Sequence, residues 1–158
     1  IFPLIGRNLG KQQLTTLRDE LNAMDGYLFL QKRIRPFEYR REISVGEETL
    51  ALSAPCYTLQ PLVENSLRHA WRDGLILTVS VSEDARCVYI RVADNGRGMD
   101  AETLERLRAL ARSTDPQDGG IGLRYVFRAL KMMYASGVRI EIDSASDVGT
   151  AITITIER

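Results

Sequence analysis

The chain has 158 residues, of which 44% are hydrophobic and 27% charged, and its 21 basic residues balance its 21 acidic ones. These values are typical of a globular protein with one domain and an apolar core. The balanced charge argues against nucleic acid or an anionic membrane surface as a partner.

Two further features describe the chain as a whole. Cys56 and Cys87 lie far apart and outside any metal-binding spacing, so we expect buried thiols in a reducing compartment. No apolar run is long enough to cross a bilayer. Because the first residue is Ile, we expect a fragment, with any membrane segment lying upstream.

The first third of the chain reads as helix, then strand, then helix. Apolar residues recur at roughly helical spacing from Leu14 to Ile34, which predicts an amphipathic helix over much of 12–34 that Pro36 ends. A strand is expected over 39–44 and a loop or short strand over 50–55. A further helix is expected over 59–70.

The rest of the chain alternates strands and helices. Its apolar patterns predict the following elements: half-buried strands over 75–81 and 88–92 joined by a turn at 84–85, helices over 104–111 and 123–134, a polar loop over 112–119, and a hairpin of strands over 138–144 and 150–157. We therefore expect an α+β two-layer sandwich: a mixed, mostly antiparallel sheet covered on one face by helices, with an N-terminal helix.

Three polar side chains share one side of the helix around Asn65. On a helical wheel Asn65, Arg68 and His69 fall within an arc of about 100°, opposite the apolar side. An amide oxygen suits Mg²⁺ shared with phosphates, and the guanidinium and imidazole suit a nucleotide. Taken alone, however, three polar residues on one side of a helix favour a solvated face over a binding site.

Asp94 continues the inward-facing side of the strand that carries Val88, Ile90 and Val92. A carboxylate on a core face needs a hydrogen-bond donor. The donor is either a backbone amide of the following Asn-Gly turn or the exocyclic amine of adenine. Thr150 occupies the inward side of the last strand and either completes a base pocket or bonds a backbone carbonyl.

Glycines at 119, 120 and 122 precede the helix over 123–134. Such glycines expose backbone N–H groups to an anion at a helix N-terminus, although a flexible hinge has the same composition. The chain contains no GxxxxGK[ST] string, and a polar loop rather than a strand precedes the glycines. Walker and Rossmann phosphate motifs are therefore excluded.

Three segments together resemble a known family. The stretches 59–69 (LQPLVENSLRH), 94–99 (DNGRGM) and 120–123 (GIGL) resemble the N, G1 and G2 boxes of sensor histidine kinases, and look similar to the LytS/YehU type. The resemblance covers about residues 36–158 and implies a Bergerat (GHKL) sandwich that binds Mg-ATP. It also implies that residues 1–35 are a linker helix following phosphoacceptor helices absent from this chain.

The resemblance assigns roles by position in the boxes. Asn65 would ligate Mg²⁺, Asp94 would accept the adenine amine, and the segment 99–118 would form an ATP lid. The other residues implied to bind ATP are Arg68, His69, Gly96, Gly98, Met99, Gly120, Ile121, Gly122, Leu123 and Thr150. Arg68 and Glu64 are candidate catalytic contributors.

Two departures refine the expected function. Pro61 stands where ATP-hydrolysing relatives carry a water-activating glutamate, which disfavours gyrase-like and chaperone-like ATPases and anti-sigma-factor kinases. The acceptor motif of the form NPHFLFN is absent, since the single histidine, His69, lies within the N box. We therefore expect a protein histidine kinase fragment that donates the γ-phosphate of ATP to an upstream histidine, for relay to a response regulator.

The alternative is a nucleotide-binding regulatory module of a degenerate kinase, in which no phosphate is transferred. In either case, the resemblance implies the cytoplasmic domain of a bacterial inner-membrane sensor.

Overall fold

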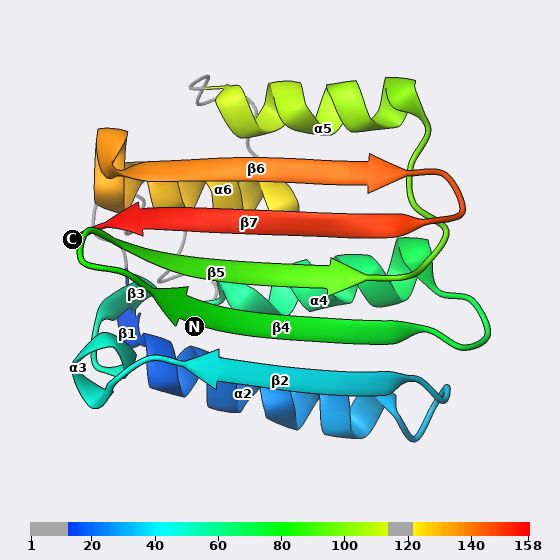
Figure 1. Ribbon diagram of the computed structural model, residues 1–158, viewed down its shortest axis with the longest axis horizontal. Coiled ribbons are helices and arrows are strands. Elements are labelled where there is room, and N and C mark those ends of the chain that lie inside the picture. The colour runs from blue at the N-terminus through cyan, green and yellow to red at the C-terminus, as the bar shows by residue number, and fades with distance from the viewer. Residues whose placement is uncertain (1–12, 114–121) are drawn as a thin grey trace.

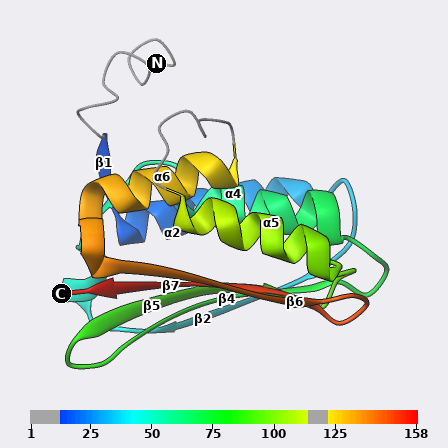
Figure 2. The same cartoon turned by 90° about the horizontal axis from the view of Figure 1, so that it is seen from above.

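The computed structural model describes residues 13–113 and 122–158, which form a sheet layer and a helix layer (Figures 1 and 2). The sheet has five strands in the order β2-β4-β5-β7-β6; only the β2–β4 pair is parallel. The strands are β2 (Glu38–Ser44), β4 (Ile76–Glu83), β5 (Cys87–Asp94), β6 (Val138–Ala145) and β7 (Gly149–Glu157). The expected α+β two-layer sandwich with a mixed, mostly antiparallel sheet is confirmed.

The helices cover one face of this sheet (Figure 2). The main ones are α2 (Leu17–Gln31), α4 (Leu59–Asn65), α5 (Ala101–Arg112) and α6 (Leu123–Tyr134). A π-helical turn, η1 (Ser66–Ala70), continues α4, and α5 runs beyond the β6 edge of the sheet (Figure 1). Two short elements complete the set: α3 (Glu47–Leu50) and η2 (Ala135–Gly137).

The N-terminal helix lies within the range predicted for it, and a short strand precedes it. The segment Leu14–Thr16 forms a strand, β1, that pairs antiparallel with β3 (Ser53–Pro55). Thr16 then caps α2, since its Oγ1 accepts a hydrogen bond of 3.1 Å from the Asp19 amide. The helix ends at Gln31, before Pro36. The expectation of helix over much of 12–34 is therefore confirmed, although Leu14–Thr16 at its start forms a strand instead.

Helix α2 shares the core of the sandwich. Leu21 and Met24 are fully buried and Leu28 is 1% exposed, in one apolar cluster with α4 and the sheet. The matching apolar stripe, with polar residues on the other side, is what the helical spacing predicted. The division of the chain at residue 35 stays a prediction.

The inward sides of the central strands agree with the sequence pattern. Leu77, Val79 and Val81 are fully buried, and β5 and β7 supply the apolar residues beside them. In the sheet register Asp94 lies between Leu77 and Thr150. A carboxylate and a hydroxyl therefore occupy neighbouring places at one end of the core face.

The cysteines are less buried than expected. Cys56 and Cys87 are free thiols of intermediate exposure, because Cys87 lies on the outward side of β5 and Cys56 follows β3. Partial burial raises the pKa of the Cys56 thiol.

Within 13–113 and 122–158, no helix is both long and apolar enough to cross a membrane.

Candidate nucleotide-binding site

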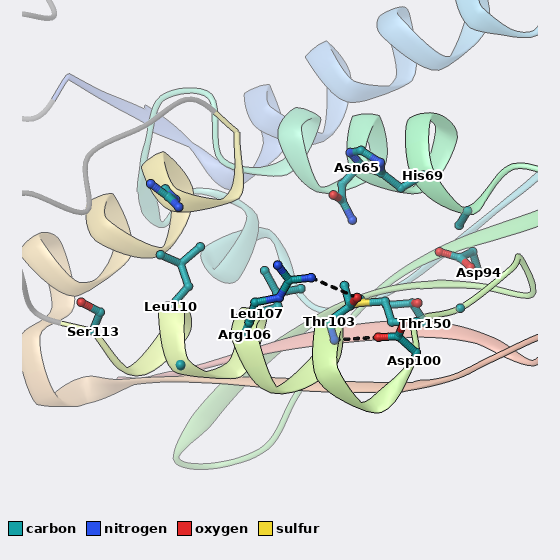
Figure 3. Close-up of a pocket in the computed structure, with 15 residues that line it drawn as sticks. Asn65, His69, Asp94, Asp100, Thr103, Arg106, Leu107, Leu110, Ser113 and Thr150 are labelled. Carbon is teal, nitrogen blue, oxygen red and sulfur yellow. Dashed lines mark hydrogen bonds between the residues drawn. The ribbon is translucent and has the colours of Figure 1, made fainter.

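A cavity of about 900 Å³ lies between the α4–η1 helix, α5 and the sheet end where β5 ends and β7 begins (Figure 3). Its volume falls within the range of small-molecule sites. Six of the predicted ligand-binding residues line it: Asn65, His69, Asp94, Gly98, Met99 and Thr150. Residues separated by most of the chain thus meet in one hollow.

Asn65 and His69 reach this cavity from the last turn of α4 and from η1. Asn65 points toward Arg106, which reaches up from α5 on the opposite side (Figure 3). The π-helical turn departs from the regular helix that the sequence pattern implied; such turns occur frequently at functional sites.

The π-helical turn is anchored from outside the cavity. The Arg35 guanidinium donates a 2.7 Å hydrogen bond to the Leu67 carbonyl and stacks over Trp71 with its Cζ 4.4 Å from the ring centroid. Arg35 therefore satisfies a carbonyl near the end of the helix and fixes the segment that carries His69.

Asp94 forms the acidic part of the cavity wall. Its Oδ1 accepts a 2.9 Å hydrogen bond from the Gly96 amide, and its Oδ2 accepts a 2.8 Å hydrogen bond from the Ser66 hydroxyl. The expected bond from the turn amide is thus present. A carboxylate has about four lone-pair sites, so both oxygens keep capacity for a further donor such as an amine.

Ser66 is a site residue that the sequence analysis missed. It is 5% exposed and links η1 to the end of β5 through the Asp94 carboxylate. A signal was available, because Ser66 follows Leu59 by seven residues and so returns to the same helix side after two turns. It lies on the buried side of the helix, among the apolar residues.

The two glycines after Asp94 serve the packing of loops. A Cβ on Gly96 would lie 2.1 Å from the Ala70 carbonyl oxygen, and Gly96 does not line the cavity. Gly98 has φ +67, and a Cβ there would lie 1.9 Å from the Ala145 oxygen. Their contacts with a base stay a prediction.

Thr150 takes part in a hydroxyl pair beneath the cavity. Its Oγ1 lies 2.8 Å from the Ser144 Oγ, which also accepts a 2.9 Å bond from the Met99 amide. Ser144 and Thr150 face each other across the β6–β7 hairpin. The pair therefore fixes the start of the segment that leads into α5.

A smaller cavity of about 240 Å³ adjoins the larger one and shares Asn65 and His69 with it. The remaining predicted residues that line it are Glu64, Arg68, Gly122 and Leu123. Gly120 and Ile121 lie outside the described residues. The predicted residues that the structure describes, with the exception of Gly96, thus line one or both of two adjoining cavities.

Helix α5 occupies the first part of the segment expected to form a lid. The Asp100 side chain caps this helix by accepting a 2.7 Å hydrogen bond from the Thr103 amide, which lowers the pKa of the Asp100 carboxyl. Arg106 on α5 and Arg124 on α6 also line the cavity. The sequence analysis missed both, because arginines on short amphipathic helices do not stand out in sequence.

The donor set fits a magnesium ion shared with phosphates. Within the two described ranges, no group of three His, Cys, Asp or Glu side chains could hold a metal by itself. A single amide oxygen from Asn65 suits Mg²⁺, which commonly keeps water and phosphate oxygens as its other ligands.

The mixed sheet, its helix cover and the cavity at the sheet end define an ATP-binding α/β sandwich. The chain belongs to the histidine kinase-, DNA gyrase B- and HSP90-like ATPase family, whose model matches residues 54–158. This family binds ATP.

Curated relatives agree with the LytS-type resemblance. The chain is 32% identical over 151 residues to sensor protein LytS of Bacillus subtilis (strain 168), covering 92% of this chain and 25% of that protein. It is 30% identical over 151 residues to the sensor histidine kinase YesM of the same organism, covering 92% and 24%. The chain therefore spans about a quarter of the length of the curated relatives it matches.

Solved structures share the fold. The catalytic domain of histidine kinase ThkA superposes with a TM-score of 0.67 at 14% identity, covering 93% of this chain and 97% of that one. The Acinetobacter baumannii histidine kinase AdeS gives a TM-score of 0.61 at 12% identity, with coverages of 93% and 67%. Identities this low show the fold alone.

Proposed function

We propose that this chain is the ATP-donating catalytic domain of a two-component sensor histidine kinase. It binds Mg-ATP and transfers the γ-phosphate to a histidine on a helix outside this chain, for relay to a response regulator. The observation that carries the proposal is the cavity in which Asp94 on one wall lies near Asn65 and His69 on another, in a chain of this ATPase family.

The adenine end of the nucleotide belongs beside Asp94. The carboxylate is held by Ser66 and by the Gly96 amide, so its free lone pairs have a fixed direction. An acceptor of this kind selects a base with an exocyclic amine. Gly98, Met99 and Thr150 border the same part of the cavity and complete the base pocket.

The phosphates belong beside Asn65 and the neighbouring cations. The Asn65 amide oxygen would ligate Mg²⁺, while the Arg68 guanidinium neutralises phosphate charge and the His69 imidazole donates a hydrogen bond to a phosphate oxygen. Arg106 and Arg124 face the same space from α5 and α6. Gly120 and Gly122, which precede the N-terminus of α6, offer backbone N–H groups to the phosphates.

Phosphoryl transfer requires mainly positioning and charge neutralisation. Mg²⁺ supplies charge neutralisation on the phosphate oxygens when bound. The chain holds the base with Asp94 and the phosphates with its amides and cations. Pro61 lines the smaller cavity and cannot act as a base, which favours transfer to a protein acceptor over hydrolysis.

The relatives support the proposed partners, which are acceptor helices and a response regulator. Those that the chain matches are named sensor proteins and sensor kinases, and they are about four times longer. The additional length of these relatives has room for acceptor helices and a sensing region, and we propose that any contact with a membrane is made by such a region. Because ATP is the donor, the domain works on the cytoplasmic side.

Phosphate transfer is tested by mixing this chain with a separate acceptor-helix segment and ATP labelled at the γ-phosphate. We expect an acid-labile label on the acceptor, as for a phosphohistidine, and little label on the chain. Confirmed nucleotide binding without any transfer would contradict the kinase and favour a regulatory module.

A further inference from the structure

We propose that Glu64 is a further catalytic residue: its carboxylate binds the N–H of the acceptor imidazole and receives that proton as the phosphate is transferred. The inference rests on the proposed kinase function and adds the group that orients the acceptor.

The Glu64 carboxylate is held from one side only. Its Oε1 accepts two 2.9 Å hydrogen bonds, one from the Tyr57 hydroxyl and one from the side-chain amide of Gln60. In the part of the chain that the structure describes, no donor reaches its Oε2. Two donors on one oxygen fix the carboxylate plane and leave the second oxygen with both lone pairs available.

Tyr57 holds this position in a strained backbone conformation. Its φ is +63, in the left-handed region that non-glycine residues rarely adopt. Its side chain is 41% exposed, so burial does not explain the conformation. Such strain gathers at functional sites, and here it directs the tyrosine hydroxyl onto Glu64.

The location of Glu64 fits an acceptor rather than a phosphate. It lines the smaller cavity together with Arg68 and Arg124, next to Asn65. A nucleotide with its phosphates at Asn65 presents the γ-phosphate near this junction. A carboxylate beside phosphates is repelled by them, so a hydrogen-bond donor lying between the two, in addition to the arginines, stabilises the complex.

A neutral imidazole meets both requirements. One ring nitrogen carries a lone pair that forms the new N–P bond, while the bond from phosphorus to the β,γ-bridging oxygen breaks and its electron pair leaves on ADP. The ring becomes cationic, and the proton on its other nitrogen passes to Oε2 of Glu64 and then to water. Glu64 therefore orients the attacking nitrogen and removes the charge that develops on the ring.

Tyr57 is a positioning residue in this scheme, because it acts through Glu64. Removing its hydroxyl loosens the carboxylate and leaves the ring and the backbone in place. Removing the Tyr57 hydroxyl should therefore lower the transfer rate only when the Glu64 carboxylate is present.

The test uses the full-length protein that contains this chain, with the rate of autophosphorylation and the Kd for Mg-ATP measured separately. Glu64→Gln should lower the transfer rate about 100-fold, with the Kd within twofold of wild type and an unchanged melting temperature. Glu48→Gln, which changes an exposed glutamate in α3, should leave both unaltered.

Two further variants separate catalysis from structure. Formate, a small carboxylate, should raise the transfer rate of Glu64→Ala about tenfold. Chloride at the same ionic strength should leave that rate unchanged. Tyr57→Phe should lower the rate about fivefold in the wild type and not further in Glu64→Gln.

The role of Glu64 is overturned if the transfer rate of Glu64→Gln lies within threefold of wild type, or if Glu64→Ala loses a large part of its rate and formate does not restore it. Either result is compatible with the proposed kinase function. A wild-type protein that binds Mg-ATP without labelling itself or an added acceptor overturns the kinase, and with it the role of Glu64.

Discussion

The Ser66 hydroxyl donates a 2.8 Å hydrogen bond to Oδ2 of Asp94, which lies 28 residues further along the chain. The bond joins η1, where Ser66 lies next to Asn65, to the end of β5. Two of the predicted ligand-binding residues are thereby coupled, because the residue that orients the carboxylate neighbours the one that carries the metal-binding amide. The adenine and phosphate ends of the site therefore depend on one short contact.

Replacing Ser66 by Ala should weaken both the fold and the site. The half-buried Asp94 carboxylate loses a donor, so we expect the free energy of unfolding to fall by about 1–2 kcal/mol. The Kd for ATP should rise about fivefold, since the carboxylate is no longer fixed. Chemical denaturation and calorimetric titration measure the two effects. Ser82→Ala on the exposed side of β4 is the control, and equal effects in both variants would contradict this role of Ser66.

Replacing Asp94 by Asn should change which base is bound. The amide offers a donor where the carboxylate offers only lone pairs, so we expect ATP affinity to fall about 10–100-fold. Affinity for a purine triphosphate without the exocyclic amine should fall much less. Competition with a fluorescent ATP analogue gives both values. An equal fall in affinity for the two nucleotides would show that Asp94 does not bind the exocyclic amine.

Gly98 and Gly74 form a matched pair for backbone strain. Both have positive φ, +67 and +81, but a Cβ on Gly98 would meet the Ala145 oxygen at 1.9 Å, while one on Gly74 would meet nothing within 4 Å. Gly74→Ala should therefore cost about 1–2 kcal/mol from strain alone, and Gly98→Ala about 3 kcal/mol or more. Thermal unfolding compares them. Equal costs would mean that the close approach of Gly98 to the β6–β7 turn does not matter.

The capping carboxylate of Asp100 should make a pH-dependent contribution to the free energy of unfolding. The Thr103 amide lowers the carboxyl pKa from its ordinary value of 3.8, so the unfolded state binds the proton more tightly. The contribution is complete above that value and declines as the pH falls through the lower pKa of the folded state. Asp100→Asn, which keeps the capping oxygen and removes the charge, should lower the denaturation midpoint at pH 7 and approach wild type as the pH falls below the lowered pKa of the folded state. A pH-independent difference would contradict this origin.

The sequence predicted the parts of the site that depend on strand alternation. Asp94 and Thr150 were placed on the inward side by a period of two, and the sheet register confirms that they are neighbours. Helical spacing also predicted α6 at its observed bounds. Both patterns work because burial of one face fixes the side on which each residue lies.

Other features could not be predicted because they depend on contacts between distant segments. Strand β1 exists only because Leu14–Thr16 pairs with Ser53–Pro55, so the helical spacing before α2 was misleading. The π-helical turn and the Ser66 bond need the Arg35 anchor and the end of β5. The close packing of Gly149 is likewise invisible in the sequence, since a Cβ there would lie 2.0 Å from the carbonyl oxygen of the distant Asp94.

The central claim is that this cavity binds Mg-ATP through Asn65 and Asp94, and titration with a non-hydrolysable ATP analogue tests it most directly. We expect a saturable rise in melting temperature, because a ligand that binds only the folded state stabilises it. The rise should shrink without Mg²⁺ and in Asn65→Ala, and nearly vanish in Asp94→Asn. No rise in the wild-type chain, or an equal rise in all three proteins, would contradict the account.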